Sequence, residues 1–250
     1  MGKNLEQQIL WIFNDKYGQK WNPEILKDIR RLKAGEPIDY IIGWKPFLNC
    51  KIDLSYKPLI PRPETEFWVE KAIEEIKASK KPAYVADVFS GSGCIGISIL
   101  KNIKNAKVDF FEIDSSLIKQ IKINLKINKI KKSRYRVIES DILEKSRKKY
   151  DFILANPPYI ATTRKNKIQK EVLKYEPKKA LFGGKDGLNL IKKFLNQAQN
   201  HLNIRGQIWM EFDSFQKPLI QELLKKSGYK EWEFYKDQYG KWRCAILKLF

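Results

Sequence analysis

The sequence predicts an α/β protein in which a mostly parallel sheet is covered by helices on both faces. From residue 84 onward, short runs rich in β-branched and aromatic residues alternate with segments of helical periodicity. This alternation is typical of repeated strand–helix–strand units, which form parallel sheets. A glycine-rich turn follows the first run, as at ligand sites of such sheets. The last two runs are joined by a short segment, which predicts an antiparallel hairpin at the sheet edge.

The strands and helices of this sheet can be placed from the pattern. Strands are expected at residues 84–87, 108–112, 135–138, 150–155, 207–212, 232–235 and 243–247. Helices are expected from Gly93, from Ser115, after Gly187 and over residues 219–226. Each helix follows a strand and has apolar residues on one side, so it can pack on a face of the sheet.

The first part of the chain differs from the rest. Apolar residues recur there at helical spacing, at Leu5, Ile9, Ile12 and Phe13. A second helix is expected from Asn22, its N-cap, to about Gly35, with Pro23 in the first helical position. Residues 40–43 and 50–54 are apolar runs between turn residues, which predict short strands or a hairpin. Residues 61–66 then open a longer helix. We therefore divide the chain into a helical unit (1–36), a linking hairpin (37–62) and an α/β domain (63–250).

The composition of the 250 residues is ordinary for a globular protein, with 43% hydrophobic residues. No apolar run approaches the ~18 residues of a membrane span, and no secretory signal is visible. The cytoplasm is therefore the expected location. A monomer is also expected, although the pattern itself does not determine the oligomeric state. The chain has three cysteines, Cys50, Cys94 and Cys244, and one histidine, His201. These are too few and too dispersed to predict a disulfide or a metal site.

The net charge of +20 has two interpretations. Clustered Lys and Arg could serve an anionic partner, either an acidic protein or RNA. Alternatively, the lysines reflect a compositional bias, because they are scattered over nearly every segment. Residues 120–128, in which Lys stands with Asn and Ile, are read as such a segment, with a solvent-exposed helix face.

A glycine-rich turn directly after the first strand is the first part of a candidate ligand site. Glycine adopts positive φ and lets the backbone pass close to a ligand, although such turns also occur without ligands. The turn and the start of the next helix consist of Phe89, Ser90, Gly91, Ser92, Gly93 and Cys94.

Two acidic residues at strand ends strengthen this prediction. Glu112 ends the second strand, where its carboxylate can accept hydrogen bonds from both hydroxyls of a ribose. Asp141 follows the third strand and can meet the amino edge of an adenine. Asp114 is a competing ribose ligand, but it also suits a helix N-cap. The turn and the acids together predict a site for an adenosine-containing ligand.

The most informative segment follows the fourth strand and consists of Asn156, Pro157, Pro158 and Tyr159. The Asn156 side chain offers a carbonyl oxygen, and Pro157, which lacks an N–H, offers a backbone carbonyl at a fixed φ. Two acceptors aimed at one planar NH2 group would hold both of its protons and orient its nitrogen. The ring of Tyr159 would pack on the flat group. A plain Pro-Pro turn is the structural alternative.

Several segments, taken in order, resemble the release factor glutamine methyltransferases, the PrmC/HemK family. They are residues 35–43, 59–66, 90–96, 156–160, 175–177, 180–188 and 237–243. The resemblance implies a Rossmann-like, seven-stranded class I fold that uses S-adenosylmethionine. It implies methylation of the glutamine in the Gly-Gly-Gln motif of class I peptide chain release factors.

The resemblance also implies roles for individual residues. Residues 89–93, Glu112, Ile142 and Asn156 would contact the cofactor, and Asp87 would orient the loop or meet the amine of the cofactor's methionine part. Residues 156–159 would hold the glutamine. Arg62 and Glu64 are expected on the substrate side, because residues 63–66 follow the version typical of enzymes that act on release factors.

The chain departs from the family at two places. Phe89 stands where the family usually has glycine, and the N-terminal helical unit is only about half its usual length.

Three alternative functions are considered beside the main one. A sister group acts on a glutamine of a ribosomal protein, and a non-catalytic adaptor could retain the fold. A nucleic-acid methyltransferase would act on an adenine amino group, but residues 160–186 leave little room for a recognition region, so direct nucleic-acid binding is not expected.

Overall fold

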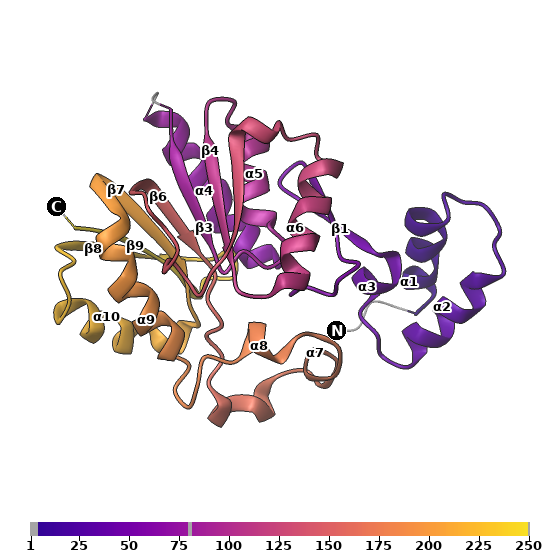
Figure 1. Ribbon diagram of the computed structural model, residues 1–250. Coiled ribbons are helices and arrows are strands. Elements are labelled where there is room, and N and C mark those ends of the chain that lie inside the picture. The colour runs from indigo at the N-terminus through magenta and orange to yellow at the C-terminus, as the bar shows by residue number, and fades with distance from the viewer. Residues whose placement is uncertain (1–4, 80–81, 250) are drawn as a thin grey trace.

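The computed structural model describes residues 5–79 and 82–249. Its centre is a sheet of seven strands with helices on both faces (Figure 1). In chain order the strands are β3 (Tyr84–Val88), β4 (Lys107–Glu112), β5 (Tyr135–Glu139), β6 (Tyr150–Ala155), β7 (Leu202–Glu211), β8 (Glu231–Lys236) and β9 (Trp242–Lys248). They are arranged in the order β5-β4-β3-β6-β7-β9-β8. The α/β class and the sheet predicted from the sequence are confirmed.

The strand directions follow the expected pattern. Strands β3 to β7 pair in parallel, whereas β9 pairs antiparallel with both β7 and β8. The predicted antiparallel hairpin at the sheet edge is therefore present, and its reversed strand is β9, one place in from the edge. Because five neighbouring strands run the same way, their carboxyl ends meet at one edge of the sheet, the lower edge in Figure 1.

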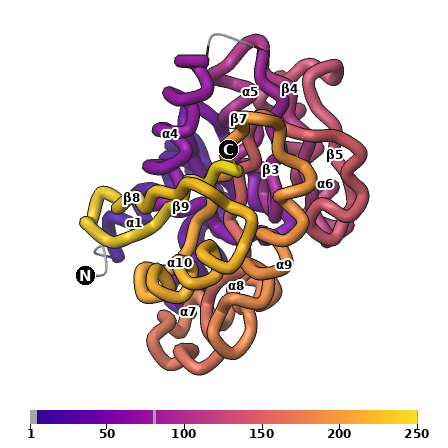
Figure 2. Tube along the Cα trace, turned by 90° about the vertical axis from the view of Figure 1, so that its left-hand side faces the viewer, coloured from indigo at the N-terminus to yellow at the C-terminus, as the bar shows by residue number. Residues whose placement is uncertain are grey.

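The helices divide between the two faces of the sheet (Figure 2). One face is covered by α4 (Pro63–Ala78), α5 (Cys94–Asn102) and α6 (Ser115–Ile127), and the other by α9 (Asn189–Ala198) and α10 (Lys217–Lys225). Each face has its own apolar core. Trp68 of α4 and Phe110 belong to the first core, and Phe194 of α9 and Phe212 belong to the second.

The remaining elements lie at the N-terminus and between β6 and α9. They are α1 (Leu5–Trp11), a π turn (Ile12–Lys16), α2 (Glu24–Lys33), α3 (Ile38–Ile42), β1 (Trp44–Phe47), β2 (Cys50–Asp53), α7 (Lys170–Tyr175) and α8 (Lys178–Leu181). Short 3-10 turns lie at residues 132–134, 162–167, 199–201 and 214–216. Helices α7 and α8 belong to an insert that lies below the carboxyl edge of the sheet in Figure 1.

One prediction for the linking segment is wrong. Residues 40–43 were expected to be extended, but Ile38–Ile42 is the helix α3, ended by Gly43 at a φ of +91°. Tertiary packing overrides the β-branched composition, because neighbouring side chains face different cores: Tyr40 packs in the main core and Ile41 in the cluster of the N-terminal helices. The hairpin itself is present, as β1 and β2.

The lysine side of residues 120–128 is solvent-exposed as expected, with Lys122 and Lys126 on it, but the opposite side of α6 is not. Gln120, Asn124 and Asn128 are buried, at helical spacing. Their amides bind the backbone of the hairpin segment. Asn124 Oδ1 accepts from Asp53 N at 2.7 Å, and Asn128 Nδ2 donates to Lys51 O at 2.8 Å. These amides are thus the means by which the hairpin is docked on the α/β domain.

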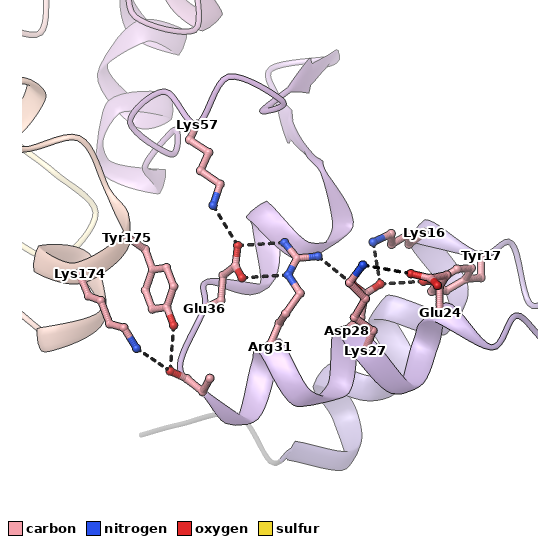
Figure 3. Close-up of polar contacts among 11 residues, drawn as sticks. Lys16, Tyr17, Glu24, Lys27, Asp28, Arg31, Glu36, Lys57, Lys174 and Tyr175 are labelled. Carbon is pink, nitrogen blue, oxygen red and sulfur yellow. Dashed lines mark hydrogen bonds and ion pairs between the residues drawn. The ribbon is translucent and has the colours of Figure 1, made fainter.

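A polar network joins the N-terminal helices to the rest of the molecule (Figure 3). Arg31 of α2 makes two hydrogen bonds of 2.9 Å with Glu36, which also pairs with Lys57 beyond the hairpin. Hydrogen bonds from Arg31 hold the pKa of Glu36 below its ordinary value. Tyr175 of α7 donates to the carbonyl of Ala34 at 3.0 Å. The helical unit therefore contacts both the linker and the insert.

Candidate active site

The sheet register brings the predicted site residues to one edge. Val88 pairs with Phe111 on one side and with Ala155 on the other, and Ala155 pairs with Met210. The residues that follow these strand positions are Phe89, Glu112, Asn156 and Glu211. The glycine-rich loop, the ribose candidate and the Asn156 segment are thus neighbours at the carboxyl edge, as expected for parallel strands.

The glycine-rich loop turns through left-handed backbone at three positions. Phe89, Gly91 and Gly93 have φ values of +59°, +55° and +79°. An L side chain in this region costs about 1–2 kcal/mol, so Phe89 is strained where glycine would not be. Its ring packs edge-to-face on Phe194, with 6.0 Å between ring centroids. Ser90 fixes the turn, because its hydroxyl donates to Asp87 O at 2.7 Å.

Glu112 is buried and faces the loop. One carboxylate oxygen accepts from Gly91 N at 2.8 Å, and the other accepts from the backbone N–H groups of Ile113 and Asp114, each at 2.9 Å. Burial raises the pKa of Glu112. Asp114 instead caps α6, since it accepts from Ser116 N at 2.9 Å. Of the two competing acids, Glu112 is therefore the one that lies against the loop.

Asp87 is a second buried acid under the loop. Its Oδ2 accepts from Gly96 N at 2.9 Å, whereas Oδ1 is buried and has no hydrogen-bond partner among the described residues. Burial raises the pKa of Asp87 well above its ordinary value. An unpartnered acceptor beside a left-handed turn fits a ligand that brings its own ammonium group. The residues present therefore fit a cofactor with an amino group and a ribose.

The residues after β5 lie at the same edge with a different environment. Ile142 is buried and adopts a φ of +56°, which is unusual for a β-branched residue. Asp141 is half-exposed, and Lys193 of α9 pairs with its carboxylate at 2.5 Å.

Ile113, which the sequence analysis did not single out, is 63% exposed directly after Glu112. An apolar residue between two acids was the only signal for it in the sequence.

The segment after β6 is held by residues from distant elements. Pro157 and Pro158 are buried, and Asn156 and Tyr159 are half-buried. Asn156 Nδ2 donates to Thr65 Oγ1 at 3.3 Å, and the Tyr159 hydroxyl donates to Glu211 Oε1 at 2.9 Å. Gln216 Nε2 donates to the carbonyl of Tyr159 at 2.9 Å.

Glu211 and Gln216 were missed by the sequence analysis. Glu211 follows three apolar residues at the end of β7, and a glutamate in that position was the available signal. Burial raises its pKa. Gln216 lies fully buried after the same strand.

Arg62 and Glu64, predicted on the substrate side, lie at the start of α4. Arg62 Nη2 pairs with the buried Glu176 at 2.5 Å, and Glu176 also accepts from Ile60 N. Arg62 therefore ties the linker to the insert that follows Tyr159. Glu64 is half-buried in the first turn of α4.

Two further findings concern the described residues as a whole. Within residues 5–79 and 82–249 no three His, Cys, Asp or Glu side chains are grouped so as to hold a metal ion. None of the helices in these ranges combines the length and apolar character needed to cross a membrane.

The chain is similar to known methyltransferases in sequence and in fold. Residues 72–185 match the model of the methyltransferase small domain family. The release factor glutamine methyltransferase of Thermodesulfovibrio yellowstonii is 37% identical over 88% of this chain and 78% of its own. That of Clostridium botulinum is 34% identical over 100% of this chain and 90% of its own. A ribosomal protein L11 methylase from Lactobacillus delbrueckii subsp. bulgaricus shares the fold, with a TM-score of 0.56 at 21% identity over 76% of this chain and 80% of its own.

The sheet, the left-handed loop and the two buried acids define a class I, S-adenosylmethionine-dependent methyltransferase. Identity to the curated relatives over most of both chains then specifies the branch of this class. The chain belongs to the release factor glutamine methyltransferase family.

Proposed function

We propose that this enzyme transfers a methyl group to the side-chain amide nitrogen of the glutamine in the Gly-Gly-Gln motif of class I peptide chain release factors. The observation that carries the proposal is the orientation of Asn156. Its nitrogen is bonded to Thr65 Oγ1, so its carbonyl oxygen is the atom left to meet a substrate N–H.

The cofactor half of the site has the groups that S-adenosylmethionine requires. Glu112 would accept from the ribose hydroxyls, Asp87 from the ammonium group, and the backbone of residues 90–93 would border the cofactor. Ile142 and Asp141 would lie on the adenine side, together with Ile113. Bound there, S-adenosylmethionine supplies an electrophilic methyl group on its sulfonium.

The residues at 156–159 perform the remaining work on the substrate. An amide nitrogen is a weak nucleophile, because its lone pair is delocalised into the carbonyl. Asn156 Oδ1 and the carbonyl of Pro157 would each accept a hydrogen bond from one of its two N–H groups, which orients the nitrogen and stabilises the positive charge that develops on it. After transfer the methylated nitrogen carries a positive charge and is strongly acidic, so it loses one proton to water and the proposal needs no strong base. Tyr159 would pack on the amide plane.

The proposal extends to partner and place. Release factors act on ribosomes in the cytoplasm, and we place the enzyme there as a monomer. The helical unit (1–36) would help to grip the partner, because its contacts with α7 put it next to the insert that leads from Tyr159.

The test is a transfer assay with methyl-labelled S-adenosylmethionine. The wild-type protein is incubated separately with a release factor, with the same factor carrying Gln→Ala in its Gly-Gly-Gln motif, with ribosomal protein and with DNA. We expect label only on the intact release factor. Label on DNA or on ribosomal protein instead would overturn the proposal. Calorimetric titration with S-adenosylmethionine tests the adaptor alternative, which predicts no binding.

A further inference from the structure

A buried carboxylate lies behind the substrate half of the site. Glu211, 1% exposed at the end of β7, accepts hydrogen bonds from three side chains. Thr65 Oγ1 at 2.6 Å and Trp68 Nε1 at 2.8 Å, both from α4, bind Oε2. The Tyr159 hydroxyl binds Oε1 at 2.9 Å. Glu211 therefore joins α4 to the segment that follows β6.

The number of hydrogen-bond donors in this network determines which end of the Asn156 amide faces Thr65. With Glu211 ionised, its Oε2 can only accept, and it accepts from the indole N–H of Trp68. The single proton of the Thr65 hydroxyl is used on that same oxygen. Thr65 Oγ1 can then only accept from Asn156, so the atom of Asn156 at 3.3 Å must be its NH2 group. The amide oxygen of Asn156 consequently points away from Thr65.

We propose that Thr65 and Glu211 are positioning residues that fix the Asn156 amide in the orientation that methyl transfer requires. The inference rests on the proposed function, because it assigns a use to the oxygen of Asn156. It also gives Thr65 a role, because within residues 63–66, which resemble the release-factor version of the family, Thr65 is hydrogen-bonded to Asn156.

A cation beside the network offsets the cost of burying Glu211. The side chain of Arg243 is largely buried, and its Nε donates to Asp237 Oδ2 at 3.1 Å. Its positive charge acts on both Glu211 and Tyr159. A nearby opposite charge reduces the penalty for a buried carboxylate. Residues 237–243, one of the segments that resemble the family, thus support the same network through Arg243 of β9.

The first test compares two substitutions at one position. Thr65→Val keeps the shape of the side chain and removes its hydroxyl, whereas Thr65→Ser keeps the hydroxyl. We expect Thr65→Val to lower kcat for release factor methylation roughly 10-fold, the effect of about 1.4 kcal/mol in the barrier, and Thr65→Ser to stay within about threefold of wild type. The Kd for S-adenosylmethionine should be unchanged in both. Near-normal kcat in Thr65→Val would overturn the inference.

A double-mutant cycle separates positioning from a merely structural role. If Thr65 acts through Asn156, adding Thr65→Val to Asn156→Ala should change single-turnover rates by less than about twofold. A further roughly 10-fold loss in that background would contradict the inference. Side-chain amide resonances of Asn156 give a readout without turnover: the hydrogen-bonded proton should move in Thr65→Val and stay in place in Thr65→Ser. Identical resonances in all three proteins would also overturn it.

Failure of the inference can be told apart from failure of the proposed function. If the wild type does not label the release factor, the proposed function is wrong, whatever the variants do. If the wild type labels it and Thr65→Val does so equally well, only the positioning role is wrong.

Discussion

The two halves of the active site are built in different ways. On the cofactor side, the contacts join residues close in sequence: Glu112 with Gly91 at a separation of 21 residues, and Asp87 with Gly96 at 9. On the substrate side, Asn156 meets Thr65 across 91 residues, and Thr65 meets Glu211 across 146. The first half is local backbone geometry, whereas the second depends on how α4 packs against β7.

This difference has a functional consequence. A loop that binds through backbone N–H groups and positive φ depends mainly on its own turn and the adjacent strand. An asparagine held through a chain of side chains responds to changes in any member of that chain. We therefore expect substitutions where α4 meets the carboxyl end of β7 to affect turnover, and substitutions at the carboxyl ends of β3 and β4 to affect cofactor affinity.

The largest effect is expected for Asn156→Ala. The change removes the acceptor that orients the substrate amide, and loss of one oriented polar group typically costs about 100-fold or more in kcat. The Kd for S-adenosylmethionine should change much less, because the contacts of Glu112 and Asp87 remain. Steady-state kinetics and calorimetry measure the two quantities.

A matched control for this prediction lies at the opposite end of the sheet. Asn203, near the start of β7, donates to Asp151 at 2.8 Å, far from the carboxyl edge. Asn203→Ala should leave both kcat and Kd near wild type. An Asn156→Ala enzyme with normal kcat, or one that had lost cofactor binding to the same extent as turnover, would break the division between the halves.

The reverse pattern is expected for Glu112→Gln. The change removes a charged acceptor, and hydrogen bonds to charged groups contribute about 1.5–3 kcal/mol each. The Kd for S-adenosylmethionine should therefore rise roughly 10-fold to 100-fold, with kcat at saturating cofactor within a few-fold of wild type. Glu139 is the control, because it pairs with Glu112 in register but is exposed. Glu139→Gln should leave the Kd unchanged; if it had the same effect, net charge would be the cause.

The same residue predicts a pH dependence of cofactor binding. Burial raises the pKa of Glu112, so on acidification it gains its proton at a higher pH than an exposed glutamate. A protonated carboxyl is a weaker acceptor for ribose hydroxyls. Affinity for S-adenosylmethionine should thus fall as the pH drops toward the raised pKa of Glu112, and calorimetry across pH should show a flatter profile for Glu112→Gln. Equal profiles would remove Glu112 as the titrating group.

The division between the halves also explains what the sequence could predict. Strands β3 to β9, the left-handed loop and Glu112 follow from local patterns, because each depends on residues close in sequence. Thr65 and Glu211 do not, since nothing local indicates that a helix-start threonine meets a strand-end glutamate. The burial of Gln120, Asn124 and Asn128 could not be predicted for the same reason, because their hydrogen-bond partners lie in a linking segment that is distant in sequence. The helix α3 was hidden by its β-branched residues, which pack on two separate cores.

The smallest effect, and the sharpest test of the backbone character of the cofactor half, is expected at Phe89. At a φ of +59°, glycine relieves the strain of an L side chain, so Phe89→Gly should be more stable than Phe89→Ala by about 1 kcal/mol. This is the reverse of the usual order for alanine and glycine. Both variants lose the contact with Phe194, which therefore cancels in the comparison. Urea unfolding measures the difference.

The affinity for S-adenosylmethionine should separate the same two variants in the same order as their stability. If the loop binds S-adenosylmethionine through its backbone, the ring of Phe89 is dispensable, and Phe89→Gly should keep a Kd within a few-fold of wild type. Phe89→Ala should bind more weakly than Phe89→Gly, because alanine keeps the strain of a side chain at positive φ without the packing on Phe194 that offsets it in the wild type. An alanine variant as stable and as tight as the glycine variant would mean that the loop does not need positive φ at this position. Loss of binding in both would instead assign the contact to the ring, and the cofactor half would then depend on side chains as the substrate half does.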